Sequence, residues 1–184
     1  MQASQNWRWV VNPDDMQLRI LLDHQQQHIC PYKTSRLVPL GPLNASFSVA
    51  DAEAFELFSE ALASSAALTS EVIVAATLNY LIMSHFGRPQ MPQSWYFQQQ
   101  EAAIQYPLQL GSLVELNSGL ASATFVLINH SDDVSECMLL DASMALSEIK
   151  TLHQFDVIKV LNNRLQPSAA MGSLSADSVL LRLA

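Results

Sequence analysis

The chain has 184 residues, 49% of them hydrophobic and 14% charged, which suits one large or two small domains and is too apolar for a disordered chain. Nine Lys and Arg residues against 17 Asp and Glu residues give a formal net charge of −8. This excludes a general nucleic-acid binder, which needs a dense cationic surface. No pair of the five glycines has the spacing of a P-loop or a dinucleotide-binding fingerprint.

The N-terminal residues lack the basic and apolar regions of a signal peptide. The longest apolar stretch, about 72–83, is interrupted by polar residues and is shorter than the roughly 20 residues of a membrane span. Cys30 and Cys137 form no CxxC pair. We therefore expect a reduced, soluble, cytoplasmic protein without membrane insertion.

The first elements in chain order are two short strands. Apolar and polar residues alternate over 7–11 and again over 18–22, with the turn sequence Asn-Pro-Asp-Asp at 12–15, and this pattern predicts a β-hairpin. Prolines and a glycine divide 26–49 into short pieces, with candidate strands near 29–33 and 47–49.

Two helices are predicted next. The segment 51–67 is rich in Ala and Glu, has an apolar stripe and carries acidic residues in its first turns. A second helix starts after Thr69 or Ser70, either of which suits an N-cap, and ends near Gly87. Because this helix is apolar on nearly every side, we expect it at the centre of a core.

Beyond a polar stretch at 98–101 the pattern changes to short strands, at 112–117, 123–130, 136–141, 144–149 and about 155–161, with a turn at 162–163. The predicted class is α+β. An N-terminal α/β domain, 1–100, has a strand hairpin plus two helices. A small antiparallel β-barrel-like domain, 101–167, follows it, and 168–184 is a loosely held tail.

Candidate catalytic residues are few. His24 and His28 have the i, i+4 spacing of metal ligands on a helix, but Gln25 stands where a metalloprotease has its Glu. Cys137 lies in an apolar run, which favours an inert buried thiol over a nucleophile. We expect no catalytic residue, metal or cofactor. The alternative is a metal-dependent or cysteine hydrolase that uses His24, His28 or Cys137.

Aromatic residues gather in two places, Trp7 and Trp9 near the start and the proline-punctuated loop 87–97, which ends in Trp95, Tyr96 and Phe97. Trp, Tyr, Met and Arg are enriched at the centres of protein interfaces. For Trp7 and Trp9 we favour a place in a core. For the loop, a structural role and an interface role stay equally open.

Three sequence blocks resemble a known family. They are Asn-Trp-Arg-Trp at 6–9, Pro-Gln-Met-Pro-Gln-Ser-Trp-Tyr-Phe at 89–97, and 156–167 with the run Asp-Val-Ile-Lys-Val-Leu-Asn-Asn-Arg. In order and spacing they are similar to the ZapC family of gammaproteobacterial cell-division proteins. The resemblance implies a cytoplasmic, non-enzymatic protein at the division septum that binds the globular core of polymerised FtsZ and promotes lateral bundling of its protofilaments.

The resemblance also implies where the partner binds. The family's fold has an N-terminal α/β domain and a C-terminal barrel-like domain, each with a pocket, and its interaction surface surrounds an apolar centre with basic residues. The matching partner-binding residues here are Arg88, Trp95, Phe97, Lys159 and Arg164. Gln93 departs from the pattern, because relatives often have Lys at this position.

Overall fold

The computed structural model describes residues 1–65, 68–101, 104 and 106–168. The chain divides into two compact units. Unit 1 comprises Met1–Ala63 and Thr69–Pro89, and unit 2 comprises Ser64–Leu68 and the chain from Gln90 onward. Apart from the buried Ser168, the predicted tail 168–184 lies outside the described residues.

Unit 1 is built on a four-stranded antiparallel sheet with the order β3-β2-β1-β4. The strands are β1 (Arg8–Val11), β2 (Leu18–Leu21), β3 (Gln27–Ile29) and β4 (Leu43–Ser46). The predicted hairpin is confirmed as β1 and β2, paired from Arg8↔Leu21 to Val11↔Leu18. β3 and β4 begin two and four residues before the predicted segments 29–33 and 47–49. β3 shows no alternation of apolar and polar residues and that of β4 spans only four residues, so neither pattern defined the limits of its strand.

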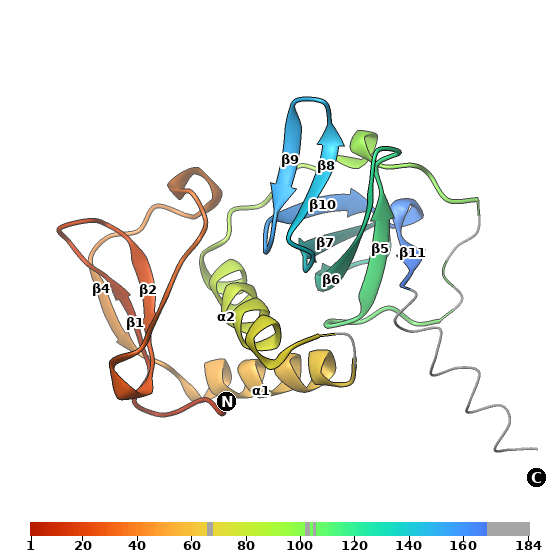
Figure 1. Cartoon of the computed structure of the whole chain (residues 1–184). Coiled ribbons are helices and arrows are strands. Elements are labelled where there is room, and N and C mark those ends of the chain that lie inside the picture. The colour runs from red at the N-terminus through yellow and green to blue at the C-terminus, as the bar shows by residue number, and fades with distance from the viewer. Residues whose placement is uncertain (66–67, 102–103, 105, 169–184) are drawn as a thin grey trace, which may run out of the picture. The chain divides into compact units, whose positions relative to one another are not determined.

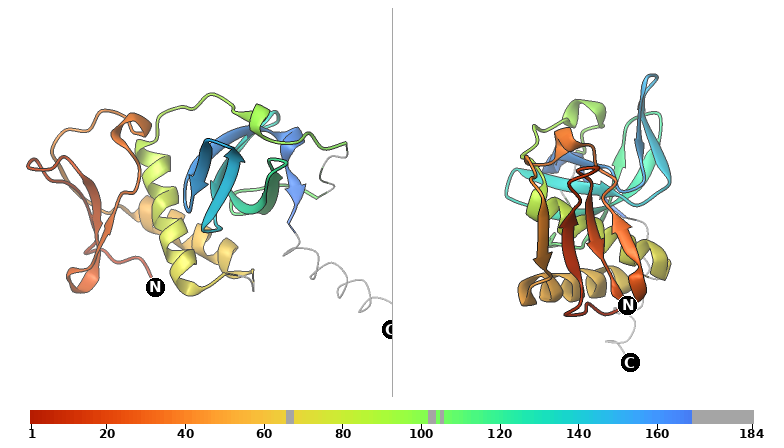
Figure 2. Two further views of the ribbon diagram at one scale, coloured as in Figure 1. Left: turned by 45° about the horizontal axis from the view of Figure 1, so that its top comes forward. Right: turned by 90° about the vertical axis from the view of Figure 1, so that its left-hand side faces the viewer.

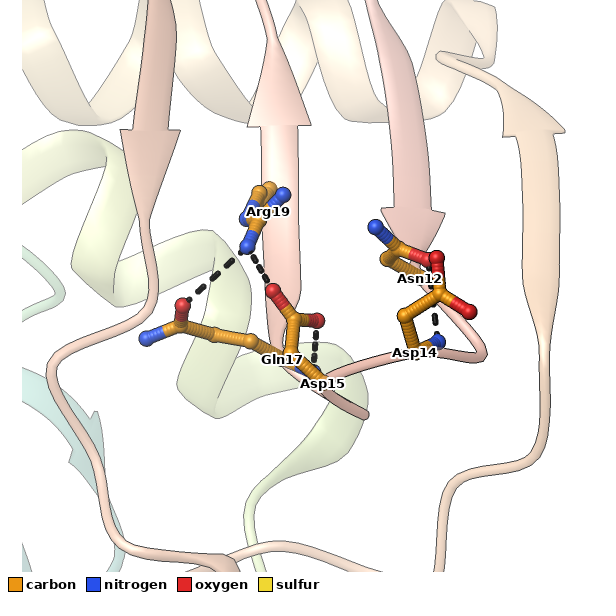
Figure 3. A network of polar contacts seen from close by, with 5 residues as sticks. All are labelled: Asn12, Asp14, Asp15, Gln17 and Arg19. Atoms are coloured by element: carbon orange, nitrogen blue, oxygen red, sulfur yellow. Dashed lines mark hydrogen bonds and ion pairs between the residues drawn. The ribbon is translucent and has the colours of Figure 1, made fainter.

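Polar side chains close the β1–β2 connection (Figure 3). The Asn12 side chain accepts a hydrogen bond from the Asp14 backbone N–H, and the Asp15 carboxylate accepts one from the Gln17 backbone N–H. The Arg19 guanidinium pairs with Asp15 and also donates to Gln17. Side chains that bond to nearby backbone are what make Asn and Asp effective turn residues.

Both helices pack on one face of this sheet (Figure 2, right). They are α1 (Val49–Ala63) and α2 (Ser70–Phe86). Thr69 is the N-cap of α2 and accepts from the Val72 N–H, as predicted, and Gly87 ends the helix. Trp9 of β1 and Trp7, which directly precedes β1, pack in one core with side chains of both helices. The helix residues of this core include Phe55, Leu78, Leu81 and Ile82.

Unit 2 contains a five-stranded antiparallel sheet, ordered β10-β7-β6-β5-β11, and a separate two-stranded hairpin (Figure 1). The sheet strands are β5 (Leu113–Asn117), β6 (Ser122–His130), β7 (Val134–Leu139), β10 (Val157–Leu161) and β11 (Gln166–Pro167). The hairpin consists of β8 (Ser143–Ser147) and β9 (Lys150–His153). Its side chains Met144, Leu146 and Leu152 join the core of the larger sheet.

The predicted barrel is only partly matched. Within the described residues the sheet stays open, because no pairing joins its edge strands β10 and β11. The strand predicted over 144–149 is two residues too long, since Glu148 and Ile149 form a turn between β8 and β9.

No helix in the described part of the chain has the length and apolar character needed to cross a bilayer.

Candidate partner-binding surface

The segment 90–100 lies along the outer edge of β10 in unit 2. The Gln93 N–H donates to the Lys159 carbonyl at 2.8 Å, and the Ser94 hydroxyl accepts from the Leu161 N–H at 2.7 Å. Farther along, the Gln100 N–H donates to the Asn163 carbonyl at 2.8 Å. These bonds bring together two of the sequence blocks, 89–97 and 156–167. They also explain why 90–100, which the sequence analysis places in the first domain, clusters with unit 2.

A short 3₁₀ helix, Ser94–Tyr96, determines which aromatic side chains of this segment are exposed. With three residues per turn, positions i and i+3 lie on the same side, so Ser94 and Phe97 both point inward and are 6% and 5% exposed. The Phe97 ring meets Phe125 edge-on in the unit 2 core. Trp95 points the other way and is 71% exposed. Trp95 is therefore accessible to a partner, and Phe97 fixes the segment on which Trp95 stands.

Two of the predicted cations border this segment. Lys159 lies on β10, with its ammonium 3.6 Å from the Glu136 carboxylate of β7. Arg164 ends a 3₁₀ turn, Asn162–Arg164, and donates to the Gln99 side chain at 3.4 Å. The Asn162 side chain holds this turn on the β6–β7 connection by donating to the carbonyls of Ser131 and Asp132.

A third cation, Lys150 of β9, was not predicted from the sequence. Its ammonium donates to the Gln93 side chain at 2.8 Å and lies 4.5 Å from the centre of the Tyr96 ring. Gln93, the position at which the sequence departs from the expected pattern, therefore contacts a cation from another strand. The sequence shows no sign of this contact, because the pattern over 144–149 predicts one continuous strand and not the turn at 148–149 that precedes Lys150.

Arg88, the remaining predicted cation, belongs to unit 1. It is exposed and borders a pocket of about 740 Å³, whose lining also includes Lys33, Tyr32 and the apolar Leu18 and Leu37. The five predicted residues are thus divided. Trp95, Phe97, Lys159 and Arg164 come together in unit 2, and Arg88 stands on unit 1.

The residues of the alternative hydrolase reading have other surroundings. His24 lies in a short 3₁₀ turn with φ of 56° and His28 lies in β3, so they share no helix face. Cys137 is fully buried, and burial together with the charge of Glu136 raises the pKa of its thiol. Among the described residues, no three or more His, Cys, Asp and Glu side chains are grouped to hold a metal ion.

Comparison with known proteins covers residues 1–171 with two family models. The family model described as "Cell-division protein ZapC, N-terminal" matches residues 1–88, and "Cell-division protein ZapC, C-terminal" matches residues 89–171. The Cell division protein ZapC of Idiomarina loihiensis is 37% identical over 179 residues, which cover 97% of this chain and 96% of that protein. The chain belongs to the ZapC family.

Other ZapC proteins match at similar length. Those of Aeromonas hydrophila and Ferrimonas balearica are 33% and 32% identical, and the matches cover 91% and 90% of this chain and 92% and 91% of those proteins. ZapC proteins are non-enzymatic division proteins, so the hydrolase alternative is dropped. The junction between the two ZapC models, at residues 88 and 89, lies one residue before the point at which unit 1 gives way to unit 2, between Pro89 and Gln90.

Proposed function

We propose that the protein binds the globular core of polymerised FtsZ, associates with the Z ring at midcell in the cytoplasm, and promotes lateral bundling of protofilaments. Membership of the ZapC family supports a role in cell division. The FtsZ partner rests on the resemblance of the sequence blocks. The partner-binding residues proposed are Trp95, Lys159 and Arg164, supported by Phe97, with Arg88 contributing from unit 1.

One observation carries this proposal. Trp95 is 71% exposed on a segment whose neighbours Ser94 and Phe97 are buried and whose backbone is bonded to β10. A large amphipathic side chain on a rigid support loses little conformational entropy on binding, and such residues dominate interface energetics.

The two units give the protein two places at which filaments can be held. Lateral bundling requires one molecule, or one assembly of molecules, to contact two protofilaments. Arg88 on unit 1 and the Trp95 surface on unit 2 belong to different units, so we propose that they contact different FtsZ subunits.

The test is co-sedimentation of the protein with FtsZ polymerised by GTP, with light scattering to detect bundles. We expect Trp95→Ala to weaken binding by about 2 kcal/mol or more, or roughly thirtyfold. Arg164→Glu reverses a cation that contacts Gln99 on the same segment as Trp95 and should weaken binding as well. Arg88→Glu should reduce bundling more than binding.

Arg8→Glu is the matched control. It makes the same change in net charge on β1 of unit 1, where Arg8 donates hydrogen bonds to the neutral residues Asn44 and Ser46. We expect Arg8→Glu to bind and bundle as the unaltered protein does. Equal co-sedimentation of Trp95→Ala, Arg164→Glu and the unaltered protein would show that this surface does not bind FtsZ.

A further inference from the structure

We propose that the tip of the β8–β9 hairpin, Glu148–Lys150, is a second part of the surface around Trp95 and contacts an acidic segment of the FtsZ filament that also presents an apolar side chain. This inference rests on the proposed function and extends it to residues outside the three sequence blocks. The hairpin rises from the rest of unit 2 with its tip free (Figure 1).

Exposed apolar side chains of unit 2 are concentrated here. Ile149, at the turn, is 98% exposed. The described part of unit 2 exposes six large hydrophobic side chains, and two of them, Leu110 and Leu120, lie elsewhere. The other four lie on segment 90–97, the hairpin tip and the end of β10, namely Met91, Trp95, Ile149 and Leu161. Single exposed apolar residues are ordinary on soluble proteins, whereas several grouped together mark interaction sites.

The fold gives no reason for an isoleucine at this turn. Glu148 and Ile149 are the two turn residues between the paired Ser147 and Lys150. Neither has a positive φ, so the backbone tolerates Ile but does not require it. Polar residues and glycine are the usual choice at such turns. The Ile149 side chain is almost fully exposed and therefore adds little to the stability of the fold. We infer that its role is to contact a partner.

Lys150 fixes this tip to the segment that carries Trp95. Its ammonium holds the Gln93 side chain and lies against the Tyr96 ring, and the Tyr96 ring is 5.7 Å from that of Trp95. A cation over an aromatic face and a charged hydrogen bond are both stronger than contacts between neutral groups. Lys150 is therefore a positioning residue, and the tip and Trp95 are offered to a partner in a fixed arrangement.

The charge of the partner follows from the distribution of cations. In the described part of unit 2, two of the three Lys and Arg side chains contact segment 90–100, since Lys150 contacts Gln93 and Tyr96 and Arg164 contacts Gln99. Lys159 is bonded to the segment through its backbone carbonyl, while its ammonium lies 3.6 Å from the Glu136 carboxylate. The tip itself carries one carboxylate, Glu148, and elsewhere in the unit carboxylates outnumber cations. Complementary charge determines orientation and encounter rate, so the surface suits an acidic partner, in a protein of net charge −8.

The test uses the full chain and co-sedimentation with FtsZ polymers. We expect Ile149→Ser to weaken binding about tenfold, in line with the loss of one buried aliphatic side chain, and to leave the melting temperature unchanged. Leu57→Ser is the matched control, because Leu57 of α1 is 67% exposed and lies on unit 1. Lys150→Met should weaken binding and reduce its salt dependence, whereas Lys150→Arg should retain both.

The outcomes separate this inference from the proposed function. If the unaltered protein does not co-sediment with FtsZ, both fail. If Trp95→Ala loses binding and Ile149→Ser keeps it, the Trp95 surface stands and the role of the tip is overturned. A concentration-dependent dimer of the protein alone that Ile149→Ser abolishes would assign the tip to a second copy of the chain, which also overturns the proposal.

Discussion

The Asn-Trp-Arg-Trp segment of unit 1 and the Ser-Trp-Tyr-Phe segment of unit 2 are both rich in aromatic residues, yet their tryptophans lie in opposite environments. Trp7 and Trp9 are 1% and 4% exposed, and Trp95 is 71% exposed. Each buried indole N–H has a carboxylate partner. Trp7 donates to Asp23 at 2.9 Å and Trp9 donates to Asp51 at 3.1 Å. The comparison teaches that a tryptophan is readily buried where the core also supplies a hydrogen-bond acceptor for its indole N–H.

The largest effect that would break this comparison is expected from Trp7→Ala. The Trp7 ring packs edge-on against Phe47 and Phe55, so its removal leaves a cavity and should cost about 3–5 kcal/mol of the free energy of unfolding. Trp95→Ala should change that free energy by less than about 0.5 kcal/mol. Urea unfolding of both variants measures the difference, and a similar loss in each would show that Trp95 also belongs to a core.

A smaller effect is expected from Asp51→Ala, which removes the acceptor for Trp9. Asp51 is 4% exposed, accepts from the Trp9 indole and the Ser48 backbone N–H, and lies 2.6 Å from His85 Nε2. Leaving buried donors without a partner should cost about 1–3 kcal/mol. Glu60→Ala, an exposed position on the same helix, is the control for lost charge.

The Asp51 carboxylate also makes the stability of unit 1 depend on pH in the acidic range. Burial raises the pKa of Asp51, but hydrogen bonds from Ser48 and Trp9 and the nearby His85 outweigh burial and hold this pKa below its ordinary value. A lowered carboxyl pKa contributes stability above the unfolded value, about 3.9, and this is lost as the pH falls through the folded value. Unfolding measured from pH 6 downward should show this loss in the unaltered protein, and Asp51→Asn should flatten it. Equal slopes for both would contradict the role of Asp51.

The smallest expected effect is a change in the stability of unit 1 near neutral pH, which depends on His28. The Nε2–H of His28, in β3, donates to the Asn79 side-chain oxygen at 2.9 Å. Burial lowers the pKa of His28, and this contact partly opposes the shift. A histidine with a lowered pKa contributes stability that is lost as the pH falls below about 6.5. The melting temperature should fall slightly between pH 7.5 and 5.5, and His28→Gln should remove that fall. Binding through Trp95 should not follow the His28 titration.

The sequence predicted the elements with strong local signals. The limits of α2 followed from Thr69 and Gly87, and β1 and β2 followed from alternation around Asn-Pro-Asp-Asp. β9 was missed because Glu148 and Ile149 carry no turn signal. The separation of Trp95 from Phe97 depends on the three-residue period of one short helix, and the contact of Lys150 with Gln93 joins residues 57 apart in the chain. Such contacts depend on strand register, which a single sequence does not specify.

The bonds between segment 90–100 and β10 also have a consequence for solubility. β10 is an edge strand, and an uncovered edge is a template for strand addition by another chain. The Gln93 N–H and the Ser94 hydroxyl occupy the Lys159 carbonyl and the Leu161 N–H on that edge. Edge-to-edge aggregation becomes more frequent as the local concentration of a protein rises, so a covered edge matters most where many copies are crowded together. The segment that presents Trp95 thereby also keeps crowded copies from joining their sheets.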